Sequence, residues 1–210
     1  MKVLIVNGSP NENGSTRRAL DEIASTLKEN GIESEIFWIG KNPISGCLSC
    51  RACKNLGKCV IDDVVNEFTE KAKKADGFVF GSPVYYAGAN GALISFMDRA
   101  FYSSKLSGSD TFAFKPAAAV ACARRAGTTP TLDQITKFFS ISAMPVITST
   151  YWNEVHGNSP AEVEQDEEGL ITMRNLAKNM AWFLSLKELG EKNGIEYPEM
   201  EKKPFTNFIR

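Results

Sequence analysis

The chain has 210 residues, and its 24 basic and 25 acidic side chains leave a formal net charge of −1. This length predicts one domain, and a hydrophobic fraction of 43% is enough for a substantial core. The near-neutral charge argues against a nucleic-acid-binding surface and against a polybasic membrane anchor. Because His156 is the only histidine, a two-histidine zinc site is excluded, and any histidine-activated nucleophile would need this residue.

The first apolar run, residues 3–6, ends at the Asn-Gly-Ser-Pro segment 7–10. It is too short for a signal-peptide core or a membrane span, so we expect a cytoplasmic protein that binds neither membrane nor nucleic acid. Thiols stay reduced in that compartment. The four cysteines between positions 47 and 59 are therefore expected to form a metal-binding or redox site rather than a disulfide framework.

Short apolar segments alternate with amphipathic segments along the chain. Strands are predicted where apolar residues follow one another, at 3–6, 33–39, 77–80, 117–122 and 144–148. Helices are predicted where apolar residues recur every three or four positions, at 19–27, 64–72, 93–101, 132–139 and 160–184. This alternation predicts an α/β fold with a doubly wound parallel sheet, covered by helices on both faces.

The last predicted helix has the clearest start, because Ser159 and Glu162 form a capping box with Pro160 at the first helical position. We expect one domain over residues 1–190, with a cysteine-rich insertion at 43–61. The polar C-terminal tail, 191–210, is expected to pack across the surface or onto a partner subunit.

The loop between the first strand and the first helix, residues 8–16, is rich in groups that bind anions. Ligands of doubly wound folds bind at the carboxyl ends of strands, where a helix N-terminus also offers free N–H groups. The side-chain donors of this loop are Ser9, Asn11, Ser15 and Thr16. No lysine follows Gly14 and no G-x-G-x-x-G pattern is present, so this is neither a Walker loop nor a dinucleotide fingerprint. The loop suits a terminal monophosphate such as that of FMN; the alternative is an ordinary turn with a Ser/Thr cap.

Two further loops follow the third and fourth predicted strands, at 81–88 and 122–129. The first presents Tyr85 and Tyr86, which suit a flat ring, and the second presents Arg124 and Arg125. An arginine near the pyrimidine end of a flavin would stabilise negative charge on the reduced ring. The alternatives are tyrosines that pack under a loop and a solvated arginine pair.

The cysteine spacing is C-x2-C-x2-C-x5-C, from Cys47 through Cys50 and Cys53 to Cys59. Three thiolates at three-residue spacing can converge on a small inorganic core, and a fourth completes the set for a cubane. The spacing differs from the usual ferredoxin run, which has a shorter last gap and a proline after its fourth cysteine. Plain buried thiols, a structural zinc and a redox-active disulfide are the alternatives. Cys122, at the end of a predicted strand, is expected only to pack.

Four segments together resemble the NADPH-dependent FMN reductase and iron–sulfur flavoprotein branch of the flavodoxin-like superfamily. They are the phosphate loop (8–10 with 13–16), the four-cysteine segment, residues 81–86 and residues 96–99. The resemblance covers residues 1–185 and implies a five-stranded parallel sheet in the order 2-1-3-4-5. It also implies homodimers or homotetramers with the flavin near a subunit boundary, so that the segment 151–158, with His156, would reach a flavin site.

The resemblance further implies a set of ligand-binding residues. For the FMN phosphate these are Ser9, Asn11, Asn13, Gly14, Ser15 and Thr16. For the FMN ring they are Pro83, Val84, Tyr85, Tyr86, Ala87, Ala123, Arg124, Arg125, Ala126 and Gly127. For a [4Fe–4S] cluster, as in the iron–sulfur flavoproteins, they are Cys47, Cys50, Cys53 and Cys59.

Two functions follow as hypotheses. The first is an FMN-dependent oxidoreductase that passes electrons from NAD(P)H through the flavin to a quinone, a flavin, a nitro or azo compound, or a protein. The second is an electron-transfer flavoprotein with FMN and a [4Fe–4S] cluster, reduced by a ferredoxin-like partner. In both, the chemistry takes place on the flavin, and no side chain is expected to act as a catalyst. A zinc- or thiol-stabilised binding module without flavin is a third alternative.

Overall fold

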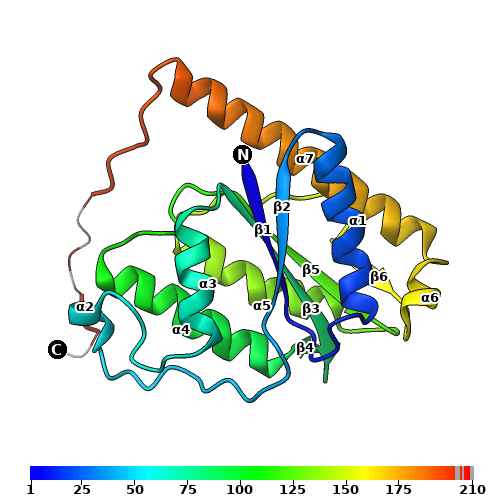
Figure 1. Ribbon diagram of the computed structural model, residues 1–210, viewed down its shortest axis with the longest axis horizontal. Coiled ribbons are helices and arrows are strands. Elements are labelled where there is room, and N and C mark those ends of the chain that lie inside the picture. Colours follow the sequence, from blue (N-terminus) through cyan, green and yellow to red (C-terminus); the bar gives the residue numbers. More distant parts are fainter. Residues whose placement is uncertain (202–203, 205, 209–210) are drawn as a thin grey trace.

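In the described part of the chain, five parallel strands and one short antiparallel strand form a sheet in the order β2-β1-β3-β5-β6, with β4 paired to β3 (Figure 1). The computed structural model describes residues 1–201, 204 and 206–208. The strands are β1 (Lys2–Asn7), β2 (Glu33–Trp38), β3 (Gly77–Tyr85), β4 (Gly88–Ala89), β5 (Ala117–Ala123) and β6 (Glu154–His156). With the β4 hairpin set aside, the parallel strands follow the predicted order 2-1-3-4-5.

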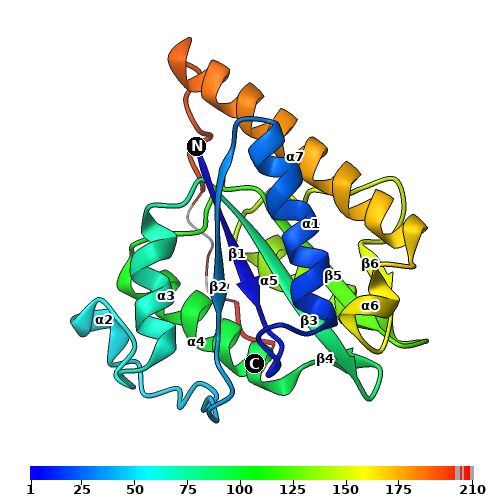
Figure 2. The same cartoon turned by 45° about the vertical axis from the view of Figure 1, so that its right-hand side comes forward.

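Helices cover both faces of this sheet, as Figures 1 and 2 show. The helices are α1 (Ser15–Glu29), α2 (Cys53–Leu56), α3 (Val64–Lys73), α4 (Gly91–Ser107), α5 (Thr128–Ile141), α6 (Pro160–Val163) and α7 (Glu167–Lys192). Helices α1 and α7 pack on one face, and α3, α4 and α5 pack on the other. The doubly wound fold predicted from the alternating pattern is confirmed.

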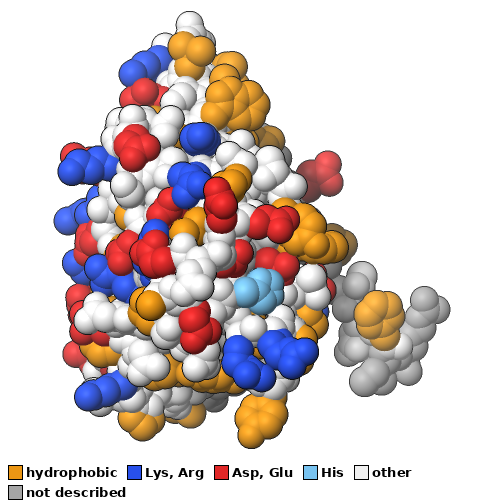
Figure 3. Space-filling view, turned by 90° about the vertical axis from the view of Figure 1, so that its right-hand side faces the viewer, with side chains coloured by type: hydrophobic (Ala, Val, Ile, Leu, Met, Phe, Trp, Pro, Cys, Tyr) orange, Lys and Arg blue, Asp and Glu red, His pale blue; other side chains and the backbone are white. Residues whose placement is uncertain are grey.

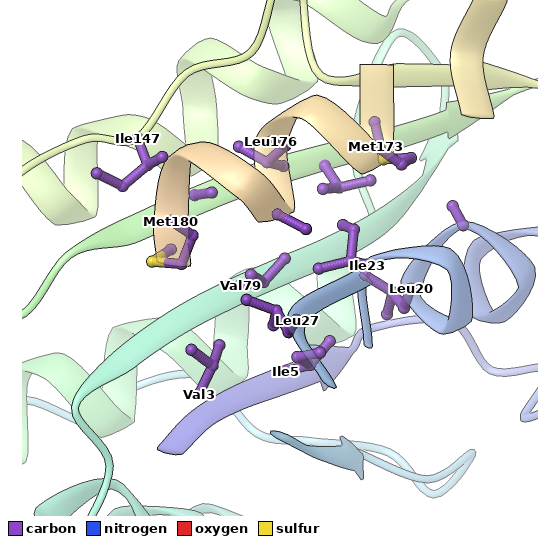
Figure 4. Close-up of a cluster of buried hydrophobic side chains, with 14 of the residues drawn as sticks. Val3, Ile5, Leu20, Ile23, Leu27, Val79, Ile147, Met173, Leu176 and Met180 are labelled. Carbon is purple, nitrogen blue, oxygen red and sulfur yellow. The ribbon is translucent and has the colours of Figure 1, made fainter. Parts of the chain in front are cut away.

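Each central strand supplies side chains to both cores, because successive residues of a strand point to opposite faces. Val3 and Ile5 of β1 pack under α1 and α7 together with Ile23 and Met173 (Figure 4). On the other face the core is aromatic. Its buried rings include Phe37, Phe68, Phe78, Phe80, Phe96, Phe101, Phe112 and Phe139. Because the sheet is buried on both faces, the ends of its strands are held rigidly, and the loops that follow them start from fixed positions.

The fifth parallel strand lies later in the chain than predicted. Residues 144–148 form only an isolated bridge, between Val146 and Ala117, so the predicted strand at 144–148 is wrong. The segment bonds to β5 only around Ala117, whose N–H donates to the Pro145 carbonyl at 2.9 Å and whose carbonyl accepts from the Ile147 N–H at 2.8 Å. Pro145 has no N–H group with which to extend this ladder. β6 takes the edge position instead and pairs with the last three residues of β5, Ala121 to Ala123.

The last predicted helix is divided in two, because Asp166 starts a new helix by accepting a hydrogen bond from the Gly169 N–H at 3.0 Å. α7 continues to Lys192, and beyond it the Tyr197 ring stacks on Phe114 with 4.9 Å between centroids. Positions 202–203, 205 and 209–210 of the predicted tail lie outside the described residues. Among the described helices, none is both long and apolar enough to cross a membrane.

Candidate functional site

A cleft of about 670 Å³ opens at the carboxyl ends of β1, β3 and β5. Three loops that were predicted to bind a ligand, 8–16, 81–88 and 122–129, supply most of its walls. Residues 157–160, between β6 and α6, close one side. Its lining residues are Ser9, Asn11, Glu12, Asn13, Gly14, Ser15, Thr16, Pro83, Val84, Tyr85, Cys122, Ala123, Arg124, Gly157, Asn158, Ser159 and Pro160. This is the edge at which parallel α/β sheets bind their ligands.

The phosphate loop, residues 8–16, leaves backbone donors free at the start of α1. Gly14 precedes the helix, and within the described residues no side chain caps this N-terminus. Space beside Gly14 is narrow, since an added Cβ would lie 3.1 Å from Asn11 Cβ. The first-turn N–H groups and the positive end of the helix dipole therefore face the cleft, which is a suitable environment for an anion.

Side chains beneath the loop fix its backbone. The buried Asn7 accepts a hydrogen bond from the Ser9 N–H at 3.1 Å, and its amide donates to the Glu12 carbonyl at 3.0 Å. Trp38 Nε1 donates to the Ser9 carbonyl at 2.7 Å. Neither Asn7 nor Trp38 was among the predicted site residues; the one signal in the sequence is a polar Asn directly after an apolar strand.

A second set of contacts joins the phosphate loop to the loop after β3. Asn90 Nδ2 donates to the Gly8 carbonyl at 2.7 Å, and the Asn90 N–H donates to Ser82 Oγ at 2.9 Å. Asn90 also caps α4, because its side chain accepts from the Ala92 N–H. Close backbone contact requires glycine at position 8, where an added Cβ would come within 2.8 Å of the Gly81 carbonyl oxygen. The two loops are therefore held as one unit.

The opposite wall depends on β6 and α6. Ser159 caps α6, and Glu164 just after it pairs with Arg18 of α1, which also binds Glu22 at 2.8 Å. These contacts hold residues 157–160 against the start of α1. Figure 3 views this side of the molecule, where acidic side chains gather at the centre of the surface and basic side chains lie below and to the left of them.

Five residues predicted to bind the flavin ring do not line the cleft: Tyr86, Ala87, Arg125, Ala126 and Gly127. Tyr86 and Ala87 form a two-residue turn between β3 and β4, with φ values of 50° and 57°, which leaves the Tyr86 side chain fully exposed. Gly127 packs against this hairpin, since an added Cβ would lie 2.7 Å from Ala87 Cα. Gly127 and Ala87 therefore pack together beside the cleft, and the Tyr86 side chain points away into solvent.

The remaining eleven residues of the FMN prediction line the cleft together. The structure adds Glu12, Cys122 and residues 157–160 to them. His156 is not among the lining residues: its Nε2 lies 3.0 Å from the Arg125 carbonyl oxygen, and its side chain borders a separate hollow with Tyr151 and Asp166. The Ser159-Pro160 cap was visible in the sequence, but its position beside the phosphate loop depends on the fold.

Cys122 closes the floor of the cleft as a neutral thiol. Burial raises the pKa of this thiol to about 12, although hydrogen bonds with Thr16 and Ser15 act in the opposite direction. The expectation that Cys122 only packs is therefore incomplete, because the thiol also contacts the two hydroxyls at the start of α1.

The four remaining cysteines lie around a second, small hollow of about 20 Å³. Cys53 is buried, Cys59 is half-buried, and Cys47 and Cys50 are exposed. Burial raises the pKa of Cys53. Among the described residues, no group of three or more Cys, His, Asp or Glu side chains is arranged to hold a single metal ion. The cysteines therefore share a hollow without converging on one point.

The backbone between these cysteines is curled tightly. Ser49 and Arg51 adopt left-handed φ values of 53° and 58°, a conformation that costs a residue with a side chain about 1–2 kcal/mol. The Ser49 N–H points to Cys47 Sγ at 3.4 Å. Four cysteine thiols are the donor set of [4Fe–4S] clusters, and hydrogen bonds to the sulfurs tune such clusters, so the residue types around this hollow fit the group.

Comparison with known proteins agrees with this geometry. The family model for NADPH-dependent FMN reductases matches residues 1–159. The chain belongs to this family. It is 35% identical to an iron–sulfur flavoprotein of Methanocaldococcus jannaschii over 198 residues, a match that covers 89% of this chain and 98% of the relative. It is 29% identical to an iron–sulfur flavoprotein of Methanosarcina thermophila, covering 89% and 96% of the two chains.

Among solved structures, a WrbA-like flavodoxin from Agrobacterium tumefaciens matches with a TM-score of 0.63 and 15% identity, covering 88% of this chain and 98% of that one. The fold is thus flavodoxin-like. As a member of the FMN reductase family with a flavin-sized cleft at the strand ends, the chain is an FMN-dependent oxidoreductase.

Proposed function

We propose that the chain is an electron-transfer flavoprotein, which holds FMN in the cleft and a [4Fe–4S] cluster on Cys47, Cys50, Cys53 and Cys59. The observation that carries this proposal is the hollow shared by those four cysteines, in a chain that also has an FMN-type cleft. FMN, when bound, supplies a ring that takes up one or two electrons and passes them on. We further propose a ferredoxin-like protein as the electron donor.

The chain's own groups would bind and orient the flavin. The free N–H groups at the start of α1 and the hydroxyls of Ser9, Ser15 and Thr16 would hold the phosphate, and the amide of Asn11 would add a further donor. Pro83, Val84 and Tyr85 would contact the ring from one side. Arg124 would stabilise negative charge on the reduced ring.

The cysteine hollow supports a cubane better than a single zinc ion. Structural zinc sites usually draw two separated pairs of cysteines, whereas these four cysteines lie within one stretch of 13 residues around a common hollow. A cubane places iron and sulfide between the thiolates and so holds them further apart. The names of the relatives, iron–sulfur flavoproteins, support the same choice.

A second candidate donor is NAD(P)H, which the family description favours. The rim of the cleft supports it through Tyr85, whose side chain is about half exposed, and Arg124, which is exposed. An aromatic ring and a guanidinium group at an open rim suit a planar ring and a phosphate respectively.

We also propose that the chain is a homodimer or homotetramer with the flavin near the interface. The fully exposed Tyr86, at the tip of a hairpin with two left-handed residues, supports a contact with a second copy at this rim. Tyr86→Ser should then reduce the fraction of oligomer in sedimentation experiments. An unchanged oligomer would place the interface elsewhere.

The donor is tested by anaerobic mixing of the FMN-loaded protein, first with chemically reduced ferredoxin and then with NADPH. Loss of the visible flavin absorbance reports electron arrival. We expect rapid bleaching by ferredoxin, at least ten-fold slower bleaching by NADPH, and slow bleaching by both in Cys50→Ser, which lacks one cluster ligand. Rapid bleaching by NADPH, unchanged in Cys50→Ser, would instead identify an NADPH-dependent reductase.

A further inference from the structure

Arg99 of α4 is buried next to the four-cysteine segment. Its side chain is 0% exposed, and it is the one charged residue among the buried residues that the structure describes. Burying an unpaired charge costs several kcal/mol, so such a side chain persists only where its partners are well placed. Burial on its own would lower the pKa of Arg99, but hydrogen bonds with Asp63 and Cys59 outweigh it, and the guanidinium stays charged.

Every hydrogen bond that this guanidinium makes with the described residues goes to one stretch of chain, between Ser45 and Asp63. Nη1 and Nη2 bind the two carboxylate oxygens of Asp63 at 2.6 and 2.8 Å. Nη2 also donates to the Ile61 carbonyl at 2.9 Å, and Nη1 lies 3.5 Å from the Ser45 carbonyl. The fifth contact is Nε to Cys59 Sγ, at 3.3 Å.

The contact with sulfur is not needed for the ion pair. The fork of Nη1 and Nη2 already satisfies Asp63, and two carbonyls take up other N–H groups. The Nε donor is directed separately at the one thiol of the set that lies closest in sequence to Asp63. A charged donor on a cluster sulfur stabilises the reduced cluster, which carries one more negative charge than the oxidised form.

We propose that Arg99 is a positioning residue with two effects: it holds the segment 45–63 in its cluster-binding conformation, and it raises the reduction potential of the cluster through the hydrogen bond to Cys59 Sγ. The second effect rests on the proposed [4Fe–4S] cluster, whereas the first does not. Helix α4, whose N-cap Asn90 binds Gly8 and Ser82 in the loops beside the FMN cleft, thus also organises the cysteine segment.

The test uses a variant that removes the buried pair together, Arg99→Gln with Asp63→Asn, because loss of Arg99 alone would leave Asp63 unpaired. Asparagine at position 63 can still cap α3. Lys58→Gln is the matched control, since it removes a half-exposed positive charge of the same segment, one residue before Cys59. Arg99→Lys is a milder variant that keeps the charge and loses the Nε donor. Retained FMN reports that each variant is folded.

In the iron-free proteins, hydrogen exchange of the amides between 45 and 63 should be at least ten-fold faster in the double variant than in the wild type or Lys58→Gln. After anaerobic reconstitution, dithionite titrations should give a more negative midpoint potential in the double variant, and a smaller shift in Arg99→Lys. Loss of iron with FMN retained also supports positioning. Unchanged exchange together with an unchanged potential would overturn the proposal for Arg99.

A failure of the proposed function would give a different result from a failure of the proposal for Arg99. If the wild-type protein takes up no iron, the cluster is refuted, and the exchange rates alone still decide whether Arg99 holds the segment. If the double variant loses FMN as well as iron, the exchange rates and potential of Arg99→Lys decide, because that variant keeps a buried cation beside Asp63.

Discussion

The FMN cleft and the cysteine segment are built in opposite ways. The cleft stands on the ends of strands that are buried on both faces, and its loops are held by hydrogen bonds from Asn7, Trp38 and Asn90. The cysteine segment is irregular apart from the single turn of α2, and one arginine side chain supplies many of its contacts with the rest of the protein. We therefore expect the cleft to be held by many contacts and the cysteine segment to depend chiefly on Arg99.

Helix α4 is the element that the two regions share. Asn90 begins it beside the phosphate loop, and Arg99, nine residues later, lies about 13.5 Å further along the helix axis at 1.5 Å per residue. Changes confined to either region should leave the other intact, because the helix between them is packed in the aromatic core. Variants that act on one region, with the other region measured alongside, test whether the two are independent.

The largest expected effect is the loss of the cluster in Cys50→Ser. A cubane needs four thiolates, so iron content should fall to less than about a tenth of the wild-type value, while FMN content stays within two-fold. Asn55→Ser, an exposed change on α2, is the control and should retain iron. Iron and sulfide assays after anaerobic purification measure this. Parallel loss of FMN would show that the two regions are not independent.

The second prediction changes the FMN cleft instead of the cysteine segment, through the double variant Ser15→Ala with Thr16→Ala. Removal of two hydrogen bonds to a charged phosphate, at about 2 kcal/mol each, should weaken FMN binding by about a thousand-fold. Ser25→Ala, on an exposed position of the same helix, is the control. Fluorescence titration of the apoprotein with FMN gives the two Kd values. A Kd within three-fold of the wild-type value would show that these hydroxyls do not bind the phosphate. The iron content of the variant should equal that of the wild type.

Cys122 gives a pH-dependent test of the cleft floor. Because its folded-state pKa is raised to about 12, while an unfolded thiol titrates near 9, its contribution to stability is complete below pH 9 and is lost as the pH rises toward 12. At pH 11 this loss is about 3 kcal/mol. Cys122→Ser should therefore lose less stability between pH 8 and pH 11 than the wild type, as measured by urea unfolding. Equal losses would mean that the thiol is not buried.

The smallest effect is expected for Trp38→Phe, which removes the donor to the Ser9 carbonyl. One hydrogen bond contributes about 1 kcal/mol, so FMN affinity should fall about five-fold. Trp182→Phe removes an exposed indole on α7 and should leave the affinity unchanged. If both variants bind FMN like the wild type, the phosphate loop does not depend on Trp38.

Sequence patterns predicted the parallel strands apart from the last one, and the loops that face the cleft, because apolar runs and glycine-rich turns are local signals. The edge strand could not be located, since its three residues carry too little pattern and the β-branched run at 146–148 is a stronger signal. The exclusion of Tyr86 and Gly127 from the cleft depends on the hairpin turn, and the support from Asn7 and Trp38 depends on tertiary contacts. Arg99 appeared in the sequence only within the segment 96–99, and its partner Asp63 lies 36 positions away, so the pairing depends on the fold.

The central claim is that one chain holds both FMN and a [4Fe–4S] cluster. Anaerobic purification, chemical reconstitution with iron and sulfide, and quantification of FMN, iron and sulfide test it directly. We expect about four iron and four sulfide per FMN, with flavin bands superimposed on a broad iron–sulfur absorbance. Stoichiometric FMN without iron after reconstitution would contradict the claim and leave a flavin reductase with an unmetallated cysteine segment.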